Sequence, residues 1–126
     1  MSNLIIIAED DPFISRMYQI KLELAGYSVV IKTNGRDAYE AIKTDHPVLA
    51  MLDINMPEMT GLEVLAALSR DNFDMKATPM IVLTNSSRDD DRALATRYGA
   101  DYVIKAELTP RQVLDMISLK APLEEA

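Results

Sequence analysis

Residues 48–65 read VLAMLDINMPEMTGLEVL, and a strand pattern gives way to a helix pattern within them. Residues 48–52 are the most hydrophobic run of the chain, as expected of a strand buried on both faces. The run ends abruptly at Asp53, and a Met-Pro pair follows. From residue 60 to 70, leucines recur at helical spacing, and Gly61 allows a tight passage from the loop into that helix. The stretch therefore predicts one strand–loop–helix unit with a lone carboxylate at the end of the strand.

The same unit recurs on both sides of this stretch. Further strands are predicted at 4–8, 28–32, 79–84 and 101–105, and further helices from Pro12 to just before Gly26, at 36–44, from Ser87 onward, and at 109–117. Strict alternation predicts an α/β fold, a five-stranded parallel, doubly wound sheet with five helices on its two faces.

Helix ends and faces follow from local chemistry. Asp11 with Pro12, and Thr109 with Pro110, have the residue types of a capped helix start, and Ser87 with the three acids after it is expected to cap another. His46 falls in a turn at the opposite end of the sheet from the strand ends and is expected on the surface. The apolar face of the first helix is predicted to comprise Phe13, Ile14, Met17, Tyr18, Ile20 and Leu24.

Length and composition limit the possible functions. The 126 residues fit a single domain (1–126), with a frayed tail expected from about residue 119 to 126. The sequence has no cysteine, which excludes disulfides and thiolate chemistry. A net charge of −7 argues against nucleic-acid binding by this chain alone. The apolar run at 4–8 is too short for a membrane span, so we expect a cytoplasmic protein without membrane contact.

Polar side chains gather where four of the predicted strands end. They are Glu9, Asp10 and Asp11 after the first strand, Asp53 after the third, Thr84 after the fourth and Lys105 after the fifth. Each has an ordinary alternative, a solvated loop acid, a turn hydroxyl or a surface lysine, and for Asp11 helix capping is the better interpretation. Jointly they favour a site, because the carboxyl ends of parallel strands meet at one edge of the sheet, where ligands bind.

The charges indicate the chemistry of that site. Clustered carboxylates repel one another and need a cation, and oxygen ligands without His or Cys favour Mg²⁺. A carboxylate beside Mg²⁺, with an ammonium and a hydroxyl within reach, is suited to attack phosphorus.

Four segments, IIIAEDDP, MLDINMPEMTGLEVL, PMIVLT and GADYVIK, resemble the signature segments of response-regulator receiver domains of two-component signalling. The resemblance runs from about Leu4 to Ile117 and implies the flavodoxin-like, CheY-like (βα)5 fold. It implies that Asp53 accepts a phosphoryl group from a histidine kinase or phosphotransfer protein. Asp10, Asp53 and the Asn55 carbonyl would bind Mg²⁺ directly, and Glu9 would act mainly through metal-bound water.

The resemblance also implies a switch. Lys105 would pair with a phosphoryl oxygen, Thr84 would bond another, and Tyr102 would be the switch aromatic, although a half-buried strand tyrosine is its ordinary alternative. A downstream protein target would read the face built by the helix after Ser87, the strand 101–105 and the helix 109–117. The same face could pair two copies weakly; otherwise the protein is a monomer. Enzymatic activity would be limited to its own phosphorylation and dephosphorylation, in a stand-alone receiver.

Two positions depart from the family pattern. Asn85 stands where a small residue is usual, and Ala106 where a proline with a cis peptide bond is usual. We expect a trans Lys105–Ala106 bond, because a cis bond before a residue other than proline costs about 2.5–4 kcal/mol.

Three other functions have requirements that this sequence meets poorly. An aspartyl-phosphate phosphohydrolase would need a second Asp where Asn55 stands, and a cap region. A flavodoxin-like electron carrier would need a Ser/Thr/Gly-rich phosphate loop where EDDP stands. A non-phosphorylated protein-binding module on the same fold would need no acidic cluster, and Mg²⁺ binding discriminates it from a receiver.

Overall fold

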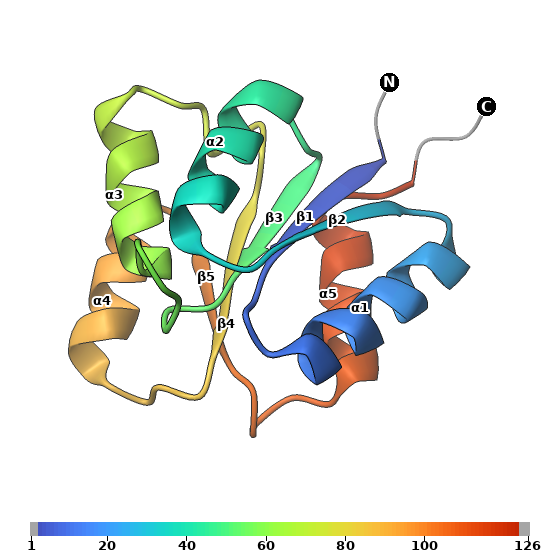
Figure 1. Ribbon diagram of the computed structural model, residues 1–126. Coiled ribbons are helices and arrows are strands. Elements are labelled where there is room, and N and C mark those ends of the chain that lie inside the picture. Colours follow the sequence, from blue (N-terminus) through green and yellow to red (C-terminus); the bar gives the residue numbers. More distant parts are fainter. Residues whose placement is uncertain (1–2, 124–126) are drawn as a thin grey trace.

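The computed structural model describes residues 3–123, and five strands alternate with five helices along them. The elements are β1 (Leu4–Ala8), α1 (Pro12–Ala25), β2 (Ser28–Lys32), α2 (Gly35–Asp45), β3 (Leu49–Leu52), α3 (Gly61–Arg70), β4 (Met80–Thr84), α4 (Asp89–Arg97), β5 (Asp101–Ile104) and α5 (Pro110–Lys120). All pairings are parallel, in the order β2-β1-β3-β4-β5. Figure 1 shows α1 and α5 on one face of the sheet and α2, α3 and α4 on the other. The predicted doubly wound fold is confirmed.

Two apolar layers hold the helices to the sheet. In β1, Ile6 and Ala8 face the layer under α2, α3 and α4, whereas Ile5 and Ile7 face the layer under α1 and α5. This alternation follows from the two-residue period of a strand. Central strands β3 and β4 are buried along their whole length, while the edge strand β2 is only half-buried. The central runs are therefore continuously hydrophobic because both of their faces are covered.

The predicted caps of α1 and α5 are confirmed. Asp11 accepts hydrogen bonds from the backbone N–H groups of Phe13 (2.9 Å) and Ile14 (3.4 Å). Thr109 and Gln112 form a reciprocal capping box at the start of α5. Because the Asp11 carboxylate caps α1, we assign it a structural role, unlike the neighbouring acids Glu9 and Asp10.

The cap predicted for α4 at Ser87 is wrong. The helix begins at Asp89 after Arg88, which makes no side-chain cap. Instead the Ser86 hydroxyl donates to the Asp91 carboxylate over 2.8 Å. Three acids in the first turn favour the helix start electrostatically, so a capping side chain is not required there.

The predicted apolar face of α1 is partly wrong. Tyr18 is buried, but Phe13, Ile20 and Leu24 are 87%, 45% and 83% exposed. Ser15 and Leu22 are buried with Tyr18, at helical spacing. The apolar stripe is broader than the area that the sheet and α5 can cover, and its outer half faces solvent.

The C-terminal boundary also differs from the expected frayed tail. Residues 119 and 120 lie within α5, and Ala121 is buried, where its carbonyl accepts the Tyr27 hydroxyl over 2.6 Å. Residues 124–126 of the expected tail lie outside the described residues. Within 3–123, no helix combines the length and the apolarity that crossing a bilayer requires.

Candidate functional site

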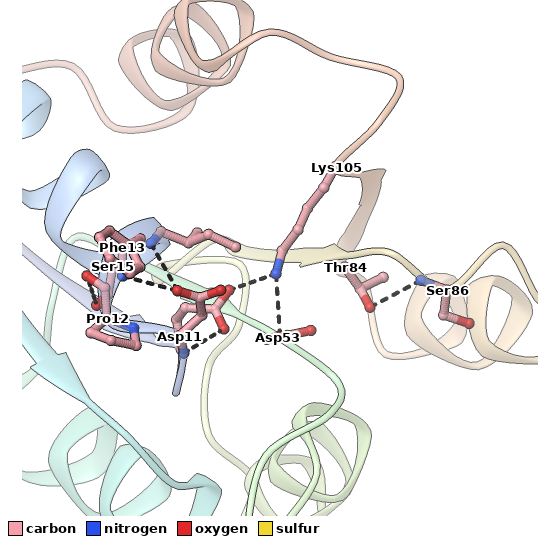
Figure 2. Close-up of polar contacts among 10 residues, drawn as sticks. Asp11, Pro12, Phe13, Ser15, Asp53, Thr84, Ser86 and Lys105 are labelled. Carbon is pink, nitrogen blue, oxygen red and sulfur yellow. Dashed lines mark hydrogen bonds and ion pairs between the residues drawn. The ribbon is translucent and has the colours of Figure 1, made fainter.

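The site lies at the carboxyl edge of the sheet, where β1 and β3 are neighbours and the strand order reverses. The chain leaves β1 for α1 on one face and leaves β3 for α3 on the other, which opens the edge between them. His46 is exposed at the carboxyl end of α2, outside this site, as expected. The strand ends thus bring Asp53 and Lys105 into contact, with Thr84 at the end of β4 (Figure 2).

Three carboxylates form the centre of the site. Glu9, Asp10 and Asp53 each place an oxygen within 4.8 Å of the others, and within residues 3–123 theirs is the one such acidic group. Glu9 and Asp53 are buried, whereas Asp10 is exposed. The cluster therefore has two buried acids and one acid that faces solvent.

Lys105 provides the compensating charge. Figure 2 shows its side chain reaching from the end of β5 toward Asp53. The ammonium is 2.6 Å from Glu9 Oε1 and 3.3 Å from Asp53 Oδ2. The other Glu9 oxygen accepts the backbone N–H of Asp11 over 3.2 Å. Both Glu9 oxygens are thus engaged by the protein, and the Lys105–Asp53 contact is the looser of the two ion pairs.

Burial sets the electrostatics of Glu9 and Lys105. Burial raises the pKa of Glu9 above its ordinary value, and the Asp53 charge adds to this, against the lowering effect of the Lys105 hydrogen bond. An apolar hollow lined by Tyr18, Met51 and Leu83 lies against Glu9 and Asp53. Burial alone would lower the pKa of Lys105, but the hydrogen bond to Glu9 and the Asp53 charge outweigh it and raise that pKa. The lysine is therefore held as a cation.

Thr84 and Tyr102 meet at Ser86, in the loop after β4. Thr84 is fully buried, and its hydroxyl accepts the Ser86 backbone N–H over 3.2 Å. The half-buried Tyr102 donates its hydroxyl to the Ser86 carbonyl over 2.8 Å, with the Arg92 guanidinium 5.0 Å from the centre of its ring. Sequence reasoning missed Ser86, because it acts here through backbone groups that every residue type carries.

The loop from Asp53 to Gly61 is tightly folded. Gly61 N–H donates to the Ile54 carbonyl over 3.0 Å, and a Cβ on Gly61 would lie 2.3 Å from the Asp53 carbonyl oxygen. The predicted tight passage at Gly61 is therefore confirmed. The side chain of Asn55 is exposed, whereas Met56 is buried and anchors the loop.

The two residues that depart from the family pattern directly follow Thr84 and Lys105 in the sequence. Asn85 and Ala106 are both exposed, at the ends of β4 and β5. The Lys105–Ala106 peptide bond is trans, as predicted. Beside them, Lys105 keeps its contacts with the carboxylates, and Thr84 is fully buried.

The donor set fits a hard divalent cation. The carboxylates of Glu9, Asp10 and Asp53 supply oxygen alone, the exposed Asp10 leaves one side open to water, and Mg²⁺ prefers such a site. The residues present can bind a metal, hold an ammonium beside it and present one carboxylate to a substrate.

Comparison with known proteins agrees with this arrangement. The response regulator receiver domain family matches residues 5–118. YkoG of Bacillus subtilis, named a transcriptional regulatory protein, is 39% identical over 102 residues, which are 80% of this chain and 43% of that protein. The chain thus spans less than half the length of the curated relatives it matches.

Solved structures show the same fold. A CheY-like receiver domain protein from Methanospirillum hungatei superposes with a TM-score of 0.85 at 26% identity, covering 96% of this chain and 94% of that one. The BeF3-activated receiver domain of Klebsiella pneumoniae RstA gives 0.82 at 28% identity, covering 95% and 99%.

Proposed function

The chain belongs to the response regulator receiver domain family of two-component signalling, and on that premise we propose that it works in the cytoplasm as a single receiver domain switched by phosphorylation of Asp53. The observation that carries the proposal is the acidic cluster with its lysine. Glu9, Asp10 and Asp53 converge within 4.8 Å, and the Lys105 ammonium bridges two of them. A purely structural sheet edge would gain nothing from gathering three like charges.

Asp53 is the nucleophile in this proposal. One of its carboxylate oxygens attacks the phosphorus of a phosphohistidine on a histidine kinase or phosphotransfer protein. An O–P bond forms, the N–P bond breaks, and the electron pair of that bond returns to the imidazole nitrogen. The buried position of Asp53 beside an apolar hollow limits competing water and strengthens the electrostatic contacts made there.

Mg²⁺ is the proposed cofactor. Asp10, Asp53 and the backbone carbonyl of Asn55 would bind it directly, and it would neutralise charge on the transferring phosphoryl group. Glu9 would act through metal-bound water, since its two oxygens already hold Lys105 and the Asp11 N–H. The divalent charge would also relieve the repulsion among the three acids.

Lys105 and Thr84 would hold the product. Lys105 can exchange its 3.3 Å contact with Asp53 for a phosphoryl oxygen while it keeps Glu9. The Thr84 hydroxyl oxygen accepts the Ser86 N–H, and its proton is still available to donate. Thr84 can therefore donate a hydrogen bond to a second phosphoryl oxygen. Hydrolysis of the aspartyl phosphate in the same site would return the switch to its resting form.

The signal would leave through α4, β5 and α5. Movement of the Thr84 hydroxyl toward the phosphoryl group weakens its bond to Ser86, which is also the residue that holds the Tyr102 hydroxyl. The Tyr102 ring would then turn inward and reshape the α4-β5-α5 face as a shift between two existing states. A downstream protein target would read that face, and the same face would support at most a weak dimer. At a net charge of −7 we propose no nucleic-acid contact by this chain alone.

Phosphoryl incorporation tests the proposal. Incubation with Mg²⁺ and acetyl phosphate should load up to one phosphoryl group per chain in the wild type and none in Asp53→Asn. Asp71→Asn is the matched control, because it removes a carboxylate that pairs with Lys43 away from the site. Equal incorporation in wild type and Asp53→Asn would refute the proposal.

A further inference from the structure

The amino end of α2 abuts the loop between β3 and α3. β2, which precedes α2, contributes no side chain to the site, although the carbonyl of its last residue, Lys32, accepts the Glu9 N–H over 3.0 Å. Figure 1 nevertheless shows the start of α2 beside the β3–α3 loop. Gly35, the first residue of α2, donates its backbone N–H to the Pro57 carbonyl over 3.2 Å.

The approach at Gly35 is too close for any other residue without a local shift. A Cβ on Gly35 would lie 1.9 Å from the carbonyl oxygen of Met59, 2.6 Å from its carbonyl carbon and 2.7 Å from its Cβ. Gly35 does not take a positive φ, and alanine is the better helix former. Glycine is therefore required at this position for space rather than for backbone conformation.

The loop is braced from two sides. At its far end Gly61 packs against the Asp53 carbonyl and bonds Ile54, as described above. At its middle the Pro57 carbonyl accepts both the Met59 N–H, over 2.8 Å, and the Gly35 N–H. Asn55 lies along the chain between the two residues that these contacts hold, Ile54 and Pro57.

We propose that Gly35 is a positioning residue for the metal site. By letting α2 press directly on Pro57 and Met59, it fixes the loop that presents the Asn55 carbonyl beside Asp53. The inference rests on the proposed function, since it assigns Gly35 to the same Mg²⁺ site. A side chain at residue 35 would push Met59 away and tilt the Asn55 carbonyl out of place.

The test compares Gly35→Ala with Asn34→Ala. Asn34 caps the same helix end by accepting the Asp37 N–H over 2.8 Å, so its loss destabilises the same helix without pushing on the loop. Mg²⁺ affinity is measured for both by calorimetry and by backbone amide shifts. Gly35→Ala should bind Mg²⁺ about 10- to 100-fold more weakly, the usual effect of changing a residue that orients a metal ligand. Asn34→Ala should bind like wild type. Equal affinity in all three proteins, or an equal loss in both variants, overturns the inference.

A measurement on the wild type covers the case in which Gly35→Ala fails to fold. Metal at the loop should hold the Pro57 carbonyl in place, so hydrogen exchange at the Gly35 amide should slow on Mg²⁺ addition. Unchanged exchange there, while Asp10 and Asp53 respond to the metal, overturns the inference and leaves the proposed function standing. A wild type that binds no Mg²⁺ refutes the proposed function itself.

Discussion

Replacing Lys105 by methionine removes the one cation that contacts the acidic cluster within residues 3–123 and keeps a long, unbranched side chain. Glu9 is 4% exposed and Asp53 7%, so both carboxylates would remain in a largely water-excluded place without the ammonium. Removing one partner of a buried ion pair costs about 3–5 kcal/mol, because the other charge is left unpaired. Asp53 borders the exposed Asp10 and has some access to solvent, so we expect the lower end, about 3 kcal/mol.

The loss should appear directly in thermal unfolding without Mg²⁺. Unfolding entropy is about 2.1 cal/mol/K per residue, so for 126 residues a change of about 3 kcal/mol lowers the midpoint by about 11 °C. Circular dichroism at pH 7.5 in EDTA measures it.

The loss should also depend on pH. The pKa of Glu9 in the folded state already lies above its ordinary value of 4.5, so the native protein holds that proton more tightly than the unfolded chain. The stability contributed by this group is complete below about pH 4.5 and is lost as pH rises through the folded pKa. Without the Lys105 hydrogen bond that lowers it, the pKa rises further. The destabilisation should therefore shrink as the pH falls from 7.5 toward 5.

The double variant Glu9→Gln with Lys105→Met is the matched control. Removing both charges of the 2.6 Å pair leaves only Asp53, the acid more loosely paired with Lys105, without its cation, so most of the stability should return. A Lys105→Met protein as stable as wild type at pH 7.5, or a loss independent of pH, would refute this electrostatic reasoning.

Three further outcomes are expected. Mg²⁺ at a hundredfold excess over its dissociation constant should add about 2.7 kcal/mol to unfolding, measured by thermal melts, and Asp10→Asn should abolish the gain. Thr84→Ala should leave acetyl phosphate labelling of Asp53 largely intact, because in the proposed mechanism Thr84 contacts the phosphoryl product rather than the nucleophile. In a pull-down, phosphorylation of Thr84→Ala should not raise its affinity for the downstream protein target. An equal gain of affinity in wild type and Thr84→Ala would contradict the proposed switch. Phe13 is 87% exposed at the start of α1, three residues after Asp10, so a protein donor that reaches Asp53 should contact it; Phe13→Ala should slow phosphotransfer from such a donor about tenfold and spare acetyl phosphate labelling. Leu24→Ala, exposed at the other end of α1, is its control, and equal slowing there would count against a docking role for Phe13.

The strand pattern was sufficient to predict the sheet and the edge where the site lies. Runs such as 4–8 and 48–52 are apolar without interruption because both faces of a central parallel strand are covered. Once these runs are parallel strands, their ends meet, and Glu9, Asp53 and Lys105 must be near one another. The residue types then restrict the chemistry to a hard cation and an oxygen nucleophile.

Contacts that depend on backbone groups or on close packing could not be predicted from the sequence. Ser86 joins Thr84 to Tyr102 through its N–H and carbonyl, and Gly35 matters through a space that only the folded loop defines. Phe13 and Leu24 have the spacing of a buried stripe, but the area covering α1 is narrower than that stripe. The spacing of apolar residues in the sequence shows which side chains a helix could bury. The elements that pack against the helix determine which of those side chains are buried.

Mapping the phosphorylated residue tests the central claim most directly. The protein is incubated with Mg²⁺ and acetyl phosphate, the acyl phosphate is reduced with borohydride, and the peptides are sequenced by mass spectrometry. We expect Mg²⁺-dependent conversion of one residue, Asp53, to homoserine. Conversion of a different carboxylate, or none in a folded protein that binds Mg²⁺, would contradict it.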